Sequence, residues 1–534
     1  MNLNKELEFL SIPIKNVGLT VSEKHSHFFK GYGMYIGGCG KVNEEVQKEI
    51  EEKIFVGLGT KVVHECFEMT YPHWNPKYKN FKEGEDHLNP YDIDALDAWI
   101  EEHIENIGYG GRKFTADMKK YGAVYAMNMC GLQSHHLSEK TVSQMYAGAN
   151  EETLSIVRGN GAETTIVNEG VHPIDDEYIP TFVDTAVNLV ERMIKVFEMP
   201  IKYVSLYDEP NFGVITPHQM CRIIKLTRKK LDEKGLKDVL INGPASAGIN
   251  LAYSEAIKAI DPEAFSMYDK ITVHGYSTGM MDEIHKEQVL KIGKELWITS
   301  TGAPGDCKFS DLPRNEKGEL FDNSDVYGVV NASAVLVDVN LGASYMGAWH
   351  PLVSISNLDR LMQYYMFIVD KTTDKSVLGK DLLVTRFYDY VSTITRAIEN
   401  DAQIYYCESS EEGCMTERRD LTNSLNNQMA ALVGKNKDGK WGIAVLNKTD
   451  TETRLKELSN LYENTKPHNL AGHSVCLEVE LDIKPLYGSG RKEFRVFKTG
   501  KNGKYLEEGE LITIENGKGI LTVSPFEIIA AKEV

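Results

Sequence analysis

The stretch Ile201–Phe212 reads IKYVSLYDEPNF and joins a short apolar strand to a pair of acidic residues. Residues 203–207 predict a buried strand, because they are mostly apolar or aromatic on both faces. Asp208 and Glu209 follow, and Pro210 stops the strand because proline lacks the N–H that a ladder needs. An Asp-Glu pair here is either an acidic turn after a surface strand or a carboxylate pair in a site, and the rest of the chain must decide.

Short apolar strands of this kind alternate with helices through the middle of the chain. Four more strands follow the first stretch, and they read VLINGP, DKITVHGYS, ELWITSTG and ASYMGAWHP. Strands that are apolar on both faces and separated by helices are typical of a parallel sheet covered by helices. Eight such units over roughly 350 residues predict a closed (β/α)8 TIM barrel rather than an open doubly wound sheet.

The hydrophobic period changes from helical to alternating after about residue 395. Strand-like runs such as GIAVLN and GILTV follow, with the turn signals Asp438-Gly439 and Asn516-Gly517 between them. This pattern predicts an antiparallel β-sandwich, and the alternating strands near the N-terminus have no helix partner and are expected to join it. We therefore predict three segments, namely strands of the sandwich at 1–28, the catalytic barrel at 29–385 and the C-terminal sandwich at 386–534.

Composition excludes some classes of partner. The net charge of −19 argues against a nucleic acid or an anionic membrane, since both require a basic surface. No run approaches the ~18 apolar residues of a membrane span, and the first residues lack the long apolar core typical of a secretory signal. We predict a cytoplasmic protein, with a secreted protein whose signal peptide has been removed as the alternative. The sequence makes no prediction of oligomeric state.

The eight cysteines are scattered, and several lie inside apolar strand-like runs. Cys66 in VVHECF and Cys130 in YAMNMC are examples. Such positions indicate reduced thiols in the core rather than a disulfide framework or a zinc site. A bridge between Cys407 and Cys414 is left open, because only a short segment separates them.

Helix ends carry recognisable signals. Asn43 precedes a run with apolar residues on one face and is predicted to cap that helix. Thr216 and Gln219 have the spacing of a capping box, and Pro217 between them suits the first helical position. Gly235 is expected to end the same helix.

The carboxyl ends of the predicted barrel strands hold a set of polar and aromatic residues. In a barrel of this type, chemistry is performed at these ends. Taken in chain order, the strand-end residues are His64 and Glu65, Asn128, Asp208 and Glu209, Asn242, His274 and Tyr276, Ser300, and Trp349 and His350.

Three of these features together resemble one clan of enzymes. They are the glutamate after the fourth strand (Glu209), the H-x-Y segment after the sixth (His274 and Tyr276) and the tryptophan after the eighth (Trp349). The set resembles the clan A retaining glycoside hydrolases, and the glycine-rich first strand and terminal sandwich are most similar to family 30. The resemblance implies hydrolysis of a β-linked glycoside, an oligo- or polysaccharide, with no cofactor and no metal. It identifies Glu209 as the acid/base, which protonates the leaving oxygen and then deprotonates water.

The position of the second carboxylate departs from the family pattern. In the family this segment resembles W-x-T-E-x-G, whereas residues 297–302 read WITSTG and place Ser300 where the nucleophilic glutamate is expected. A serine hydroxyl is neutral and too short to take over that role, so the enzyme is expected to be crippled as a retaining hydrolase. Ser300 is either an engineered replacement or a natural change of function, and the intact flanking residues favour replacement.

The resemblance also implies substrate contacts. Asp208 replaces an asparagine that donates a hydrogen bond to the sugar, and its charge beside Glu209 would raise a carboxyl pKa. The alternative is an aspartate that faces an arginine or lysine. His64 stands where relatives often carry arginine. Tyr276 is expected to orient the nucleophile, and the other implied contacts are Asn128, His274 and the sugar platforms Trp349 and Trp74.

Two other functions are consistent with the sequence. One is a glycan-binding pseudoenzyme that kept the cleft and lost the nucleophile. The other is an inverting hydrolase in which another carboxylate activates water, with the candidates Asp208, Asp306, Glu65 and Glu68. The adjacent histidines His135 and His136 have no acidic partner nearby and predict no metal site.

Overall fold

The computed structural model describes thirteen parts of the chain. They are residues 12–69, 89–130, 174, 176–212, 215–249, 251–275, 283–301, 325–354, 365–370, 381–410, 429–449, 474–500 and 505–534.

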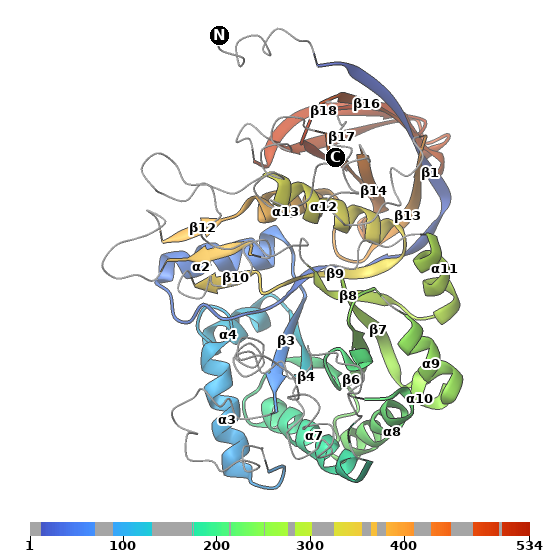
Figure 1. Ribbon diagram of the computed structural model, residues 1–534. Helices are drawn as coiled ribbons and strands as arrows, with labels where there is room; N and C mark the ends of the chain where they lie inside the picture. Colours follow the sequence, from blue (N-terminus) through green and yellow to red (C-terminus); the bar gives the residue numbers. More distant parts are fainter. Residues whose placement is uncertain are drawn as a thin grey trace, which may run out of the picture.

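Eight strands form a closed barrel in which every neighbouring pair is parallel. In order around the barrel they are β2 (Gly31–Tyr35), β3 (Val62–Glu68), β4 (Val124–Cys130), β5 (Ile201–Ser205), β6 (Leu240–Ser246), β7 (Tyr268–Gly275), β8 (Leu296–Thr301) and β9 (Ala343–Trp349). The predicted (β/α)8 barrel is confirmed, and Figure 1 shows its strands surrounded by helices.

Helices follow the strands and cover the barrel. They are α2 (Glu44–Glu52), α3 (Ile93–Asn106), α4 (Arg112–Lys120), α7 (Ile179–Lys195), α8 (Pro217–Glu233), α9 (Ala252–Ile260), α10 (Pro262–Ser266), α11 (Glu283–Ile292) and α12 (Asp325–Asn340). The capping predictions are confirmed. The Asn43 side chain accepts from the backbone of Val46, and Thr216 and Gln219 form a reciprocal capping box.

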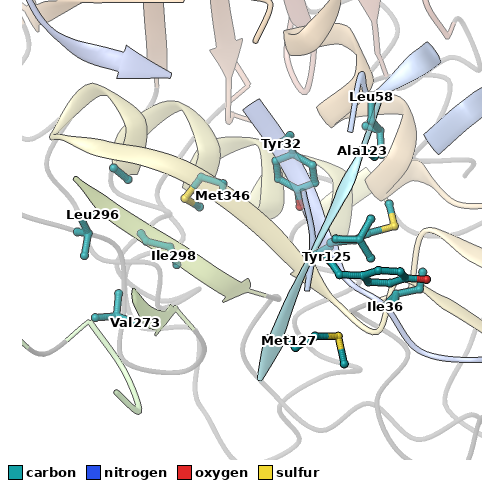
Figure 2. Close-up of a cluster of buried hydrophobic side chains, with 14 of the residues drawn as sticks. Tyr32, Ile36, Leu58, Ala123, Tyr125, Met127, Val273, Leu296, Ile298 and Met346 are labelled. Atoms are coloured by element: carbon teal, nitrogen blue, oxygen red, sulfur yellow. The ribbon is translucent and has the colours of Figure 1, made fainter. Parts of the chain in front are cut away.

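The main hydrophobic core lies between the barrel strands and these helices. It contains side chains from neighbouring strands, of which Tyr125, Val273, Ile298 and Met346 are drawn in Figure 2. A second, smaller cluster lies inside the barrel and includes Trp297 and other aromatic residues. The strands are therefore apolar on both faces, as their sequences predict.

A second closed sheet of nine strands lies beside the barrel (Figure 1). Its strands in order are β1 (Ile14–Phe29), β13 (Ala402–Ser409), β14 (Met429–Lys435), β15 (Trp441–Asn447), β20 (Ile528–Glu533), β17 (Arg491–Thr499), β18 (Glu507–Glu515), β19 (Lys518–Val523) and β16 (Cys476–Ile483). The N-terminal strand joins it as predicted. The sheet is mixed rather than wholly antiparallel, because β1 pairs parallel with β16 and antiparallel with β13.

Two helices connect the barrel to the nine-stranded sheet. In Figure 1, α12 and α13 (Arg386–Ala397) lie between the two sheets, and both helices pack on strands of the second sheet. A small sheet of β10 (Leu352–Ser354), β11 (Phe367–Val369) and β12 (Leu382–Val384) extends from the end of β9. None of the described helices is long and apolar enough to cross a membrane.

The cysteine prediction is partly wrong. Cys39, Cys221, Cys407 and Cys476 are free thiols, but Cys66 is disulfide-bonded. A cysteine in an apolar strand can be a buried free thiol or part of a buried disulfide. The sequence around Cys66 therefore does not distinguish the two states. The bridge left open for Cys407 is excluded, because its free thiol is buried inside the nine-stranded sheet.

Candidate active site

The acidic pair lies just beyond the carboxyl end of β5. The strand ends at Ser205, two residues earlier than its sequence predicts, and Asp208 and Glu209 follow a buried connection. Pro210 then begins a 3₁₀ turn that ends at Phe212. The strand therefore delivers both carboxylates to the rim of the barrel, where parallel barrels place their chemistry.

The backbone holds Glu209 in an unusual conformation. Its φ is +52°, and the φ of Ala245 on the adjacent strand is +57°. The Glu209 N–H donates to the Ala245 carbonyl at 3.0 Å, and the Ala245 N–H donates to Thr272 Oγ1 at 2.9 Å. A left-handed backbone costs a non-glycine residue on the order of 1–3 kcal/mol and is concentrated at functional sites. Contacts among the ends of β5, β6 and β7 thus fix the backbone of Glu209.

An imidazole lies between the two carboxylates. His274, near the end of β7, is 2% exposed. Its Nδ1 forms a 2.8 Å hydrogen bond with Glu209 Oε1, and its Nε2 lies 3.4 Å from Asp208 Oδ1. A protonated imidazole donates from both nitrogens and therefore suits this position between two acceptors.

Burial and charge shift the pKa values of this cluster. Burial raises the pKa of Asp208 to about 6, Glu209 adds to the shift, and His274 opposes it. Burial by itself lowers the pKa of His274, but the carboxylates of Asp208 and Glu209 outweigh burial and raise it overall. The two carboxylates therefore favour the imidazolium form of His274 over the neutral ring.

Asn128 anchors Asp208 from the end of β4. Its amide donates to Asp208 Oδ1 and lies 3.4 Å from the hydroxyl of Tyr35, the last residue of β2. Asp208 therefore faces an amide and an imidazole, and among the described residues no arginine or lysine pairs with it. The sequence analysis missed Tyr35, although its place at the end of the first barrel strand was the signal that could have found it.

Each carboxylate uses only one of its oxygens within the cluster. The contacts of Asp208 involve Oδ1, and the contact of Glu209 involves Oε1. Within the described ranges, Asp208 Oδ2 and Glu209 Oε2 have no hydrogen-bond or ion-pair partner. The two side chains are 29% and 16% exposed. The cluster thus fixes both groups and leaves one oxygen of each for a ligand.

Ser300 lies beside this cluster. It is fully buried in β8 and pairs with His274 in the ladder between β7 and β8. The pairing between β8 and β9 is irregular from Ile298 to Thr301, which is the kind of strand distortion that re-aims side chains near active sites. The structure therefore brings position 300 to the same rim as His274.

His64, which is predicted to be a substrate contact, is buried in β3. Its ring lies against those of Trp297 and Tyr345, and its Nδ1 is 3.3 Å from the Tyr345 hydroxyl. Burial and the nearby charge of His274 lower its pKa to about 3, so the imidazole is neutral. Among the described residues no carboxylate contacts it.

Trp349 stands at another part of the rim. It ends β9, is half-buried and stacks on His350 with ring centroids 4.4 Å apart. The His350 ring in turn lies 6.0 Å from the ring of Tyr35. This aromatic edge is compatible with the predicted sugar platform, because aromatic faces pack on the C–H surfaces of sugars.

Other predicted residues either lie outside the described parts of the chain or are placed elsewhere in the fold. Trp74, Tyr276, Asp306, His135 and His136 lie outside the described residues, as does the side chain of Glu68. Glu65, one of the candidate bases, is buried beside α3, where His103 Nε2 lies 3.4 Å from its carboxylate. Because its neighbours Val63 and Phe67 belong to the core between strands and helices, Glu65 faces away from the barrel interior.

The cluster also has the composition of a metal site. Asp208, Glu209 and His274 offer ligand atoms within 4.8 Å of one another. One ion would reach only one nitrogen of the ring. In this structure the two ring nitrogens face carboxylate oxygens instead, Nδ1 that of Glu209 and Nε2 that of Asp208.

The sequence matches no family model and no curated protein. The fold does match solved structures. A glycoside hydrolase family 30 subfamily 8 xylanase from Clostridium acetobutylicum has a TM-score of 0.59 and 12% identity, over 97% of this chain and 99% of that chain. A family 30 endoxylanase from Clostridium papyrosolvens has a TM-score of 0.57 and 11% identity, over 97% and 100%. An endo-β1,6-glucanase has a TM-score of 0.57 and 10% identity, over 98% and 95%. At such identities these likenesses show a shared fold of barrel and sheet domain.

Proposed function

We propose that this protein is a glycoside hydrolase that acts on β-linked oligo- or polysaccharides, with Glu209 as the acid/base. The observation that carries the proposal is the hydrogen bond between Glu209 and the buried His274 at the carboxyl ends of the barrel strands. The likeness in fold to two family 30 xylanases and to an endo-β1,6-glucanase supports it.

Glu209 must give a proton to the leaving oxygen and later recover one from water. The proton in its hydrogen bond with His274 can lie on either atom, so the imidazole stores the proton that Glu209 delivers. Asp208 stabilises the charged imidazole and thereby favours the protonated form of His274. His274 and Asp208 are therefore positioning residues in this proposal, whatever further contact Asp208 makes with substrate.

We place the nucleophile of the retaining mechanism at position 300. Ser300 is buried at the rim and has no charge to offer, so glycosides that need an enzyme nucleophile are turned over slowly. Inversion by Asp208 is disfavoured by spacing. The ligand oxygens of Asp208 and Glu209 lie within 4.8 Å, whereas inverting pairs stand ~6.5–9.5 Å apart to hold a water.

The test compares the protein with Ser300→Glu on aryl β-glycosides that carry a free 2-hydroxyl. We expect the variant to gain activity on one sugar, on the order of 10³-fold, because a nucleophilic carboxylate is restored. Ser300→Gln has the same length without the charge and should gain nothing. Adding Glu209→Gln to Ser300→Glu should remove the gain.

Equal inactivity of the two folded variants, with melting temperatures near that of the parent, would contradict a nucleophile position at residue 300. If Ser300→Glu binds a glycan tightly in calorimetry but never turns it over, the protein is instead a glycan-binding pseudoenzyme.

A further inference from the structure

Two features of the site concern the same step of the reaction, and the inference from them rests on the proposed function. The position beside His274 that would hold a nucleophile carries a neutral serine, Ser300. The residue before the acid Glu209 is the aspartate Asp208. An asparagine would have the same shape but no charge. A substrate that carries its own nucleophile would not need a carboxylate at position 300. The charge of Asp208 could then act on that substrate group.

Neither carboxylate of the cluster is placed to attack the sugar itself. Asp208 and Glu209 are adjacent in sequence and both contact the ring of His274, so they approach a bound sugar from one wall. A nucleophile must reach the anomeric carbon from the side opposite the leaving oxygen. If Glu209 protonates that oxygen, Asp208 stands on the same side as the acid and is not the nucleophile.

An acetamido group at C2 of the sugar can perform the attack. Its carbonyl oxygen reaches C1 by closing a five-membered ring, from the face opposite an equatorial leaving group. The group then requires an acceptor for its N–H and a negative charge near the oxazolinium ion that forms. Both requirements are met by one ionised carboxylate next to the acid.

We propose that the substrate is a 2-acetamido-2-deoxy-β-glycoside, that its acetamido oxygen is the nucleophile, and that Asp208 Oδ2 accepts the acetamido N–H. Asp208 Oδ1 is held by the Asn128 amide and faces His274, so the orientation of the carboxylate is fixed. Its other oxygen has no partner within the described residues, and the side chain is 29% exposed. Glu209 is held in the same way through Oε1, and its Oε2 has no partner within the described residues.

The first step breaks the bond between C1 and the leaving oxygen. The acetamido oxygen forms a new bond to C1, and Glu209 transfers its proton to the leaving oxygen, which departs as an alcohol. The oxazolinium keeps its N–H on Asp208. In the second step water attacks C1 and gives a proton to Glu209, while the C1–oxygen bond of the ring breaks and restores the acetamido group. The sum is glycoside plus water to free sugar plus alcohol, with retained anomeric configuration.

The experiment uses the full chain and 4-nitrophenyl β-glycosides in matched pairs. Each pair carries either a 2-acetamido or a 2-hydroxyl group, on gluco and galacto rings. We expect one acetamido substrate to be hydrolysed at least ~100-fold faster than its hydroxyl partner, because only the former supplies a nucleophile. Replacing the acetamido by a trifluoroacetamido group should lower kcat/KM, since fluorine makes the carbonyl oxygen less nucleophilic.

Asp208→Asn is the matched variant, because it keeps the shape and removes the charge. We expect it to lower kcat on the acetamido substrate on the order of 10²-fold. A thiazoline analogue of the cyclic intermediate should inhibit the unaltered protein and bind Asp208→Asn more weakly. Proton NMR should show the β anomer as first product.

The outcomes separate this inference from the proposed function. If the acetamido substrates are inert but Ser300→Glu hydrolyses hydroxyl substrates, the function stands and substrate assistance is wrong. Equal rates on both members of a pair, no effect of fluorination, or an inverted product would also overturn the inference. Inactivity of every form on every substrate would contradict both.

Discussion

Two buried histidines inside one barrel have opposite charge preferences. His64 is 5% exposed and His274 is 2% exposed, so water reaches neither ring freely. The pKa of His64 is lowered to about 3, whereas that of His274 is raised. Burial opposes the charged form at both positions, and the difference comes from the carboxylates of Asp208 and Glu209 at the rim.

The surroundings of the two rings explain what each region does. The layer around His64 is made of aromatic and small aliphatic side chains, with the Trp297 and Tyr345 rings 4.9 Å apart. The rim around His274 holds backbone with positive φ at Glu209 and Ala245, and two partly exposed carboxylates. We infer that the inner layer stabilises the fold, whereas the rim orients the catalytic groups at some cost in stability. Substitutions in each region test this division.

The largest expected effect is at Trp297. Trp297→Ala leaves a cavity in the aromatic layer and should lower the free energy of unfolding by about 3–5 kcal/mol. Trp349→Ala at the half-buried rim is the matched control, and it should cost far less stability while weakening glycan binding. Urea unfolding and calorimetric titration with a glycan measure the two effects. Similar losses of stability in both variants would break the division between layer and rim.

The second effect is a change in pH dependence at His64. Its pKa is about 3 in the folded protein and near 6.5 in the unfolded chain. Between these pH values His64 binds a proton in the unfolded state but not in the folded state, which favours unfolding. Acidification from pH 6.5 to 5 should therefore cost roughly 2 kcal/mol at this residue. His64→Phe removes the site, and its unfolding free energy should fall less steeply with acid than that of the parent.

His274 behaves in the opposite sense. Because its pKa is raised in the fold, its contribution to stability is complete below the unfolded pKa and is lost as pH rises through the folded value. His64→Phe leaves His274 in place, so the difference between the two unfolding curves isolates His64. Identical slopes from pH 7 to 5 would show that His64 is charged in the fold.

The smallest effect is at Thr272, which anchors the rim. Thr272→Val keeps the shape but removes the acceptor for the Ala245 N–H, and it should cost about 1–2 kcal/mol. Because Ala245 in turn accepts from the Glu209 N–H, activity should fall more than stability implies. Thr272→Ser retains the hydroxyl and should restore activity. Loss of stability with unchanged kcat would show that Glu209 is aimed by other contacts.

Much of the architecture was readable from the sequence. Strand and helix periods predicted the barrel, and the signals at Asn43 and Thr216 predicted helix starts that the structure confirms. The same reasoning placed Glu209 and His274 at strand ends. These features depend on neighbours within a few positions in the chain, which is why local patterns reveal them.

Other features depend on which strands lie side by side and on which face of the sheet a side chain lies. The side of β3 to which Glu65 points, the parallel pairing of β1 with β16, and the disulfide of Cys66 are set by register and by contacts between distant segments. The residues that flank these positions are similarly apolar whichever arrangement forms. The sequence therefore left these three features open or predicted them wrongly.

The barrel and the acidic and imidazole groups at its rim can be predicted from the sequence, because hydrophobic period and strand-end chemistry are local properties. Only the tertiary structure decided that His274 lies between Asp208 and Glu209 and that Asn128 holds Asp208. The physical reason is that these side chains come from three strands, and their distances follow from barrel closure and from the left-handed backbone at Glu209.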